Sequence, residues 1–244
     1  MEVFMSRYSK LELVYSIISL VSLFFLVTKN ELGFYITKPL IVPILLIYLF
    51  HKFNETQHQL IPALMVATIF SFLGDIFLLF TINEELFKLV GICTFIVAQT
   101  SYAYLYFLSV NSFPKKKISF LARWPEFLSS VVILGATIIL YPSLGNFAAP
   151  AIIYSFITSI TIIFALNRRF YVSRKSFVLT FLGVISFFIS DALMGDDIFL
   201  ENILNHFFIM LSYLIGHFLI IKGILFQIES TKKKDTFSDV LSFS

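Results

Sequence analysis

Three ionisable side chains lie inside long apolar stretches of the sequence, namely Lys38, Asp75 and Asp191. A charged group near the centre of a lipid bilayer costs about 2.5–3.5 kcal/mol on insertion scales, so such residues are rare there and usually functional. Two carboxyl groups in a poorly hydrated site suit acid–base chemistry, because one can keep its proton near neutral pH while the other accepts one. These residue types therefore indicate proton transfer, in catalysis or in transport.

Each of these residues also has a purely structural interpretation. Lys38 can extend its amine to the outer lipid headgroups. Asp75 shares a helix face with Ser71, so a neighbouring span can hold its carboxyl in a structural role. Asp191 follows Ser190 near the end of a predicted helix, which also fits a residue at the membrane boundary.

The elements that must position these residues are membrane helices. The chain has 244 residues, of which 58% are hydrophobic and 14% charged, whereas about a quarter of the residues in soluble domains are charged. Long apolar runs without two-residue alternation favour helices over a barrel. The predicted fold class is all-α, a polytopic transmembrane bundle of eight helices in a single domain over residues 1–228, followed by a disordered cytoplasmic tail over 229–244. The predicted spans cover about 11–28, 34–50, 60–80, 86–109, 124–141, 147–166, 177–195 and 205–226.

The second and least regular of these spans contains Pro39 and Pro43, which allow a short, kinked or partly re-entrant course.

Basic residues fall almost entirely on one side of this arrangement. Of the 18 Lys and Arg residues, fourteen lie at the termini or in even-numbered gaps, Lys29 and Lys88 lie at odd-numbered gaps, and Lys38 and Lys222 lie inside spans. The positive-inside rule then places both termini in the cytoplasm and supports the count of eight. Topology and attraction to anionic lipids explain clusters such as Lys115–Lys117 without nucleic acid. We expect an integral, multi-pass protein of the bacterial inner membrane.

The topology brings the three ionisable residues to one depth. Asp75 and Asp191 precede the outer ends of their spans by about five and four residues, and Lys38 follows the same boundary by about four. At 1.5 Å per residue, both carboxyl groups lie roughly 6–8 Å inside the outer boundary. Three separate segments therefore converge on one predicted site.

Other polar residues in the spans are weaker candidates. Gln99 and Tyr102 share a face of the fourth span, as residues that hydrogen-bond between helices do. His217 lies deep in the eighth span, where a packing role competes with catalysis. No histidine or cysteine spacing supports a transition metal, and neither a metal nor a cofactor is expected. The acidic outer loop with Asp196, Asp197 and Glu201 fits a solvated loop and leaves cation binding open.

Several short motifs follow one another along the whole chain. They are Lys38-Pro39-Leu40 in the second span, Ser71-Phe72-Leu73-Gly74-Asp75 in the third, Gly91, Phe95 and Tyr102 in the fourth, Ile189-Ser190-Asp191 in the seventh, and Tyr213 with Gly216-His217-Phe218-Leu219-Ile220 in the eighth. In order and spacing they resemble the YhhN family of lysoplasmalogenases, which are eight-span membrane hydrolases. Family members often carry a histidine where this chain has Gln99, and this departure argues against proton transfer by residue 99.

The resemblance implies hydrolysis of the vinyl ether bond of lysoplasmenyl-ethanolamine or -choline, giving a fatty aldehyde and a glycerophospho-base. It also implies that Asp75 and Asp191 are the functional aspartates. By the two-carboxylate logic of glycosidases, we assign Asp75 as general acid and Asp191 as base and cation stabiliser, two roles that can be exchanged. Supporting or substrate-binding roles are expected for Lys38, Ser71, Tyr102, Ser190 and His217. The expected partners are a lysophospholipid substrate and membrane lipids, with no nucleic acid and no protein partner.

Three other functions compete with this one. A transporter or channel would use the buried acids for protons or cations, although the spans show no convincing inverted repeat. An intramembrane aspartyl protease would need glycine at Phe72 for its Gly-x-Gly-Asp signature. A structural lipid-binding protein would retain lipid affinity without turnover.

Overall fold

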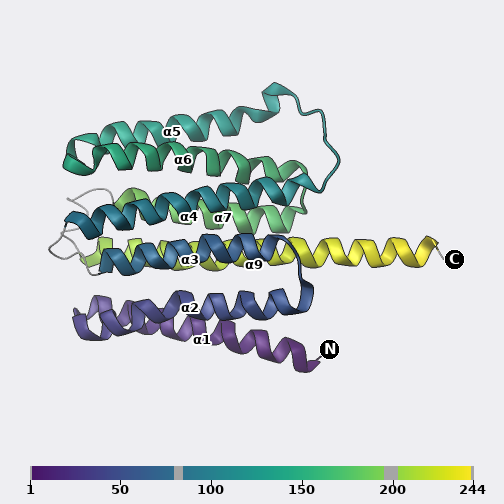
Figure 1. Cartoon of the computed structure of the whole chain (residues 1–244), viewed down its shortest axis with the longest axis horizontal. Coiled ribbons are helices and arrows are strands. Elements are labelled where there is room, and N and C mark those ends of the chain that lie inside the picture. The colour runs from purple at the N-terminus through teal and green to yellow at the C-terminus, as the bar shows by residue number, and fades with distance from the viewer. Residues whose placement is uncertain (1, 80–84, 195–202, 243–244) are drawn as a thin grey trace.

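The computed structural model describes residues 2–79, 85–194 and 203–242 and is helical throughout its regular elements (Figure 1). The long helices are α1 (Glu2–Val27), α2 (Glu31–Thr56), α3 (Leu60–Leu79), α4 (Glu85–Asn111), α5 (Trp124–Leu140), α6 (Ala148–Asn167), α7 (Arg174–Met194) and α9 (Ile203–Ser242). Short 3-10 helices join some of them: η1 (Phe120–Arg123), η2 (Tyr141–Ser143), η3 (Gly145–Phe147) and η4 (Arg168–Phe170).

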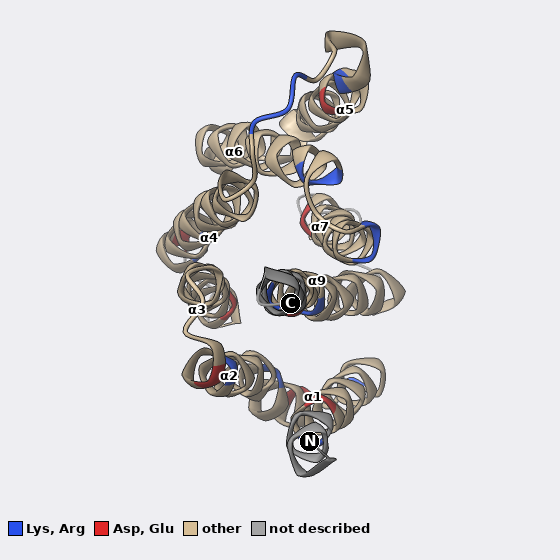
Figure 2. Cartoon of the chain, turned by 90° about the vertical axis from the view of Figure 1, so that its right-hand side faces the viewer, with Lys and Arg blue, Asp and Glu red and all other residues tan. Residues whose placement is uncertain are grey.

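Within the described part of the chain, eight helices are long and apolar enough to cross a membrane, which confirms the predicted number of spans. The chain is therefore an integral, multi-pass membrane protein. Both termini lie at the same end of the bundle, as an even number of crossings requires (Figure 1). Basic residues gather around this end, which Figure 2 turns toward the viewer. The location of this end in the cytoplasm stays a prediction.

The second span is a full helix rather than a short or re-entrant one. Helix α2 has 26 residues and continues through Pro39 and Pro43. It begins where the side chain of Asn30 accepts a hydrogen bond from the backbone N–H of Gly33. Neighbouring helices can compensate for the backbone groups that a proline frees within a membrane, and α2 packs between α1 and α3. Its length therefore follows from this packing rather than from its local sequence.

The C-terminal segment also differs from the sequence-based expectation. Helix α9 continues to Ser242, through the region from Glu229 onward for which a disordered tail was predicted. No glycine or proline follows Gly223 in this helix, so no residue breaks the helix that the eighth span begins. The assignment of residues 1–228 to a single domain stays a prediction.

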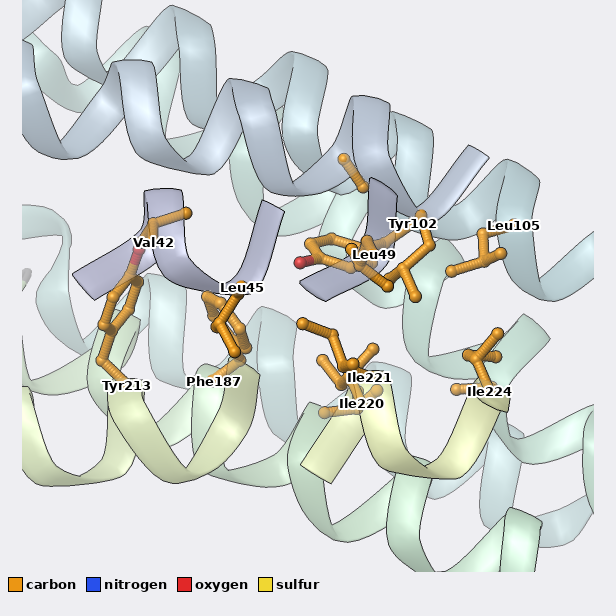
Figure 3. Packing of buried hydrophobic residues seen from close by; sticks show 14 of the residues in the cluster. Val42, Leu45, Leu49, Tyr102, Leu105, Phe187, Tyr213, Ile220, Ile221 and Ile224 are labelled. Atoms are coloured by element: carbon orange, nitrogen blue, oxygen red, sulfur yellow. The ribbon is translucent and has the colours of Figure 1, made fainter. Parts of the chain in front are cut away.

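The centre of the bundle is a close pairing of α7 and α9. Gly183 of α7 faces α9 so closely that a Cβ atom there would lie 2.8 Å from the backbone nitrogen of Ile220. Small residues at such crossings let two membrane helices approach each other. Side chains of α2 and α4 close the core around this pair, with Leu45 and Tyr102 among them (Figure 3).

A buried arginine joins three helices near the end of the bundle that carries the termini. The Arg168 side chain is fully buried. Its Nε donates a hydrogen bond to Ser109 Oγ of α4 at 3.0 Å, and its Nη2 donates to Ser176 Oγ of α7 at 3.0 Å and to Gln227 Oε1 of α9 at 2.9 Å. The guanidinium group has several donors in a rigid planar fork, which suits it to such a junction. Arg168 thus has a structural role beyond the positive-inside bias.

Candidate functional site

A cavity of about 470 Å³ lies at the end of the bundle opposite the termini, among α3, α4, α6 and α7. Much of its wall is apolar, including Leu78, Phe95 and Met194, and the turn over residues 143–147 forms one side. Gly145 in this turn has φ 48°, a left-handed conformation that residues other than glycine adopt at a cost. The volume is within the range of small-molecule sites, roughly 300–1,000 Å³.

Asp191 of α7 lines this cavity and is held by a chain of hydrogen bonds. The Tyr154 hydroxyl of α6 donates to Asp191 Oδ2 at 2.5 Å. The side-chain amide of Gln99 in α4 donates to the same hydroxyl oxygen at 3.0 Å. Because the Tyr154 oxygen accepts a hydrogen bond from Gln99, its own hydroxyl hydrogen is free to point at the carboxyl group. Three helices therefore fix the orientation of one half-buried carboxyl group at the cavity wall.

Asp75 of α3 is not among the residues that line the cavity. The Tyr213 hydroxyl of α9 donates a hydrogen bond to Asp75 Oδ2. The preceding residue, Gly74, faces α4, where an added Cβ would lie 2.6 Å from the Phe95 ring. Since successive residues point about 100° apart around a helix, the close contact at Gly74 turns Asp75 away from α4 and toward α9.

Lys38, Asp75 and Asp191 lie close enough for their charges to interact in pairs. Asp75 interacts with the Lys38 ammonium group of α2, and Asp191 interacts with Asp75. The Lys38 ammonium group also lies over the Phe34 ring, 5.6 Å from its centroid. Lys38 and Asp75 are both absent from the cavity lining. The structure thus brings the set together with only Asp191 at the cavity, and the catalytic roles of these residues stay predictions.

Of the supporting residues predicted from the sequence, Ser71, Tyr102, Ser190 and His217 are buried, and Lys38 is half-buried. Ser71 donates a hydrogen bond within its own helix to the backbone oxygen of Ala67. Ser190 donates to the backbone oxygen of Ile209 and so ties α7 to α9. Neither serine lines the large cavity.

Tyr102 and His217 carry buried polar atoms that make no hydrogen bond in the described part of the chain. The Tyr102 hydroxyl and both ring nitrogens of His217 have no partner among the residues that the structure describes. The His217 ring packs edge-on against Tyr213 and Phe187, with centroids 4.6 Å apart in each pair. His217 therefore contacts Tyr213, the residue that donates a hydrogen bond to Asp75.

Sequence reasoning missed two parts of the site. Tyr154 went unnoticed because it is one of 11 tyrosines and no motif marks it. Glu85 and Lys88 at the start of α4 also line the cavity. The scarcity of lysine at this end of the bundle is the one sequence signal that marks Lys88. Across residues 2–79, 85–194 and 203–242, no cluster of three or more His, Cys, Asp or Glu residues is placed to hold a metal ion. The acidic loop with Asp196, Asp197 and Glu201 lies outside the described residues.

Comparison with protein-family models matches residues 33–224, most of the chain, to one model, described as the YhhN family. The match begins in α2 and ends in α9, so it includes Lys38, both aspartates and the tyrosines that bind them. Comparison with curated proteins and with solved structures gave no match.

Proposed function

Because the chain belongs to the YhhN family, we propose that it hydrolyses the vinyl ether bond of lysoplasmalogens, giving a fatty aldehyde and a glycerophospho-base. The observation that carries this proposal is Asp191, a half-buried carboxyl group that is held by Tyr154 at the wall of a cavity large enough for a lysolipid headgroup and glycerol. Asp75, the other aspartate in the described membrane spans, does not line that cavity.

The cavity geometry favours an exchange of the two carboxylate roles assigned from the sequence. A general acid must reach the reacting atom directly, and Asp191 lines the cavity whereas Asp75 does not. We therefore propose Asp191 as the proton donor. Asp75, held by Tyr213 and near Lys38, acts on Asp191 through its charge, because a negative charge on one carboxyl group opposes a negative charge on the other.

The proposed reaction consumes one water molecule. Asp191 transfers its proton to the second carbon of the vinyl group, and the double-bond electrons form the new C–H bond. The resulting oxocarbenium ion is stabilised by the Asp191 carboxylate, in the way that glycosidase carboxylates stabilise theirs. Water adds to the first carbon and returns a proton to Asp191. The hemiacetal then breaks its bond to the glycerol oxygen, which takes the hydroxyl proton, and releases the aldehyde.

A second, smaller cavity offers a place for the start of the hydrocarbon chain. It has a volume of about 90 Å³ and lies among α5, α6 and α7, on residues that include Ile133, Leu140 and Phe188. Tyr154 and Asp191 line both cavities. A lipid whose headgroup occupies the large cavity and whose chain enters the small one would place its ether bond beside Asp191. The proposed route for the chain is therefore between spans, from the outer leaflet.

Substitution of each aspartate tests this function. The variant Asp191→Asn should release no aldehyde from lysoplasmenylethanolamine, and Asp75→Asn should release it much more slowly than wild-type protein, measured by mass spectrometry on purified protein. The control Glu31→Gln changes an exposed carboxylate to an amide at the same end of the bundle and should keep wild-type activity. Full activity in either aspartate variant would contradict the two-aspartate mechanism. Uptake driven by a proton gradient, without aldehyde release by wild-type protein, would favour a transporter instead.

A further inference from the structure

Two oppositely charged side chains at the cavity take no part in the proposed chemistry. Glu85 and Lys88 are exposed residues in the first turn of α4 and both line the large cavity. Asp191, which lines the same cavity, is only half-buried. The cavity therefore carries a positive and a negative group toward solvent and a carboxyl group farther inside the protein.

Lys88 and Glu85 are not engaged with each other, although they lie one helical turn apart. Among the residues that the structure describes, Lys88 forms no ion pair. Its ammonium group lies instead over the Phe147 ring, 4.7 Å from the centroid. Phe147 belongs to the turn that forms the opposite side of the cavity. Lys88 thus extends across the cavity rather than along its own helix.

We propose that Lys88 and Glu85 form a subsite for a zwitterionic lipid headgroup, with Lys88 binding the phosphate and Glu85 the ammonium group of ethanolamine or choline. The assignment deepens the proposed function and rests on it only for the identity of the lipid as a vinyl ether. Lysine is a point-charge ligand for phosphate. A carboxylate beside it selects against headgroups that lack a cation.

The order of groups along a lysolipid matches the order of groups in the cavity. The amine lies at one end, the phosphate follows, and three glycerol carbons separate the phosphate from the ether oxygen. The cavity presents Glu85 and Lys88 at the start of α4 and Asp191 farther inside. The cavity lining also includes the apolar residues Ile92 and Leu144. Such a lining favours a headgroup attached to a lipid over a free phosphate ion.

Binding of lipids that cannot be hydrolysed tests the subsite apart from catalysis. The probes are 1-O-alkyl-lysophosphocholine, which has no vinyl bond, and 1-O-alkylglycerol, which has no headgroup. Titration of purified protein in nanodiscs should show that Lys88→Gln weakens binding of the phosphocholine probe about tenfold and leaves that of the alkylglycerol unchanged. Glu85→Gln should weaken binding of the phosphocholine probe several-fold. The matched control Lys29→Gln removes a lysine at the same end, away from the cavity, and should change neither.

Two further measurements keep the proposal falsifiable if a variant does not fold. Binding of the phosphocholine probe to wild-type protein should weaken as salt concentration rises, and binding of alkylglycerol should not. Glycerophosphocholine should compete with the probe much better than inorganic phosphate. Equal competition by inorganic phosphate, salt-independent binding, equal losses of both probes in Lys88→Gln, or no binding by wild-type protein would each overturn the subsite. Headgroup-dependent binding without turnover of a vinyl ether lipid would refute the proposed function and leave the subsite standing.

Discussion

The hydrogen bond from Tyr154 to Asp191 gives the sharpest prediction about the site. The substitution Tyr154→Phe removes one hydroxyl group and keeps the aromatic ring between the two cavities. The Asp191 carboxyl group then loses the partner that fixes its orientation, while Gln99 loses its acceptor. We expect a fall in kcat/KM for aldehyde release, with folded protein retained.

The size of the effect follows from the type of bond removed. A hydrogen bond to a charged group contributes about 1.5–3 kcal/mol, and a loss of about 2 kcal/mol in transition-state stabilisation lowers kcat/KM roughly thirtyfold. Interhelical hydrogen bonds in membrane proteins stabilise the fold by only about 0.6–1.7 kcal/mol. The variant should therefore lose activity without unfolding.

A double-mutant cycle tests whether Gln99 acts through Tyr154. Loss of a neutral hydrogen bond costs about 1 kcal/mol, so Gln99→Leu alone should lower kcat/KM about fivefold. Because Gln99 reaches Asp191 only through the Tyr154 hydroxyl, the double variant should be no less active than Tyr154→Phe. The assay couples aldehyde release to alcohol dehydrogenase and follows NADH consumption. Tyr104→Phe, which removes a hydroxyl group from an exposed tyrosine of α4, is the matched control.

Two results would refute this reasoning. Wild-type activity in Tyr154→Phe would show that the bond to Asp191 does not support catalysis. If the fold-losses in kcat/KM of the two single variants multiply in the double variant, Gln99 acts independently of Tyr154.

Three further predictions concern stability. Gly183→Ala should lower the free energy of unfolding by about 1–3 kcal/mol, because the added Cβ would meet the backbone of α9. Gly135→Ala, where the added Cβ would have no atom within 4 Å, should raise the free energy of unfolding by ~0.5–1 kcal/mol. A thermal unfolding scan measures both. Arg168→Met should cost about 3 kcal/mol by removing three buried hydrogen bonds, and a wild-type midpoint would refute that structural role. His58, in the turn before α3, accepts a hydrogen bond at Nδ1 from the Leu60 N–H, and burial lowers its pKa. The folded state therefore binds a proton less readily than the unfolded state, so stability should fall as pH drops below about 6.5. His58→Asn should reduce that fall in a thermal scan at several pH values.

Much of the fold was predictable because span length and composition are local properties of the sequence. Eight apolar runs gave eight helices, and the positions of lysine and arginine indicated that both termini lie at one end. Pro39 and Pro43 do not shorten the second span, because the effect of a proline in a membrane helix depends on the neighbouring helices, here α1 and α3. Helix α9 extends beyond Glu229 because no residue there breaks a helix, a property that polar composition alone does not reveal.

The sequence predicts which residue types form the candidate site, but it does not predict the direction in which their side chains point. Asp75, Asp191 and Lys38 stood out because ionisable groups are costly in apolar surroundings. A helix that is apolar on all sides gives no sign of which face meets which neighbour, so the contact between Asp75 and Tyr213 could not be predicted from the sequence. The partner of Asp191, Tyr154, was equally hidden, because its significance lies in a contact between α6 and α7.

The central claim is that a carboxyl group of this protein protonates the carbon of a vinyl ether. Incubation of purified protein with lysoplasmenylethanolamine in D₂O, with the aldehyde trapped by reduction and analysed by mass spectrometry, tests it directly. The mechanism predicts one deuterium on the carbon next to the aldehyde carbon, and no product from Asp191→Asn. Aldehyde without that deuterium, or no aldehyde from folded wild-type protein, would contradict it.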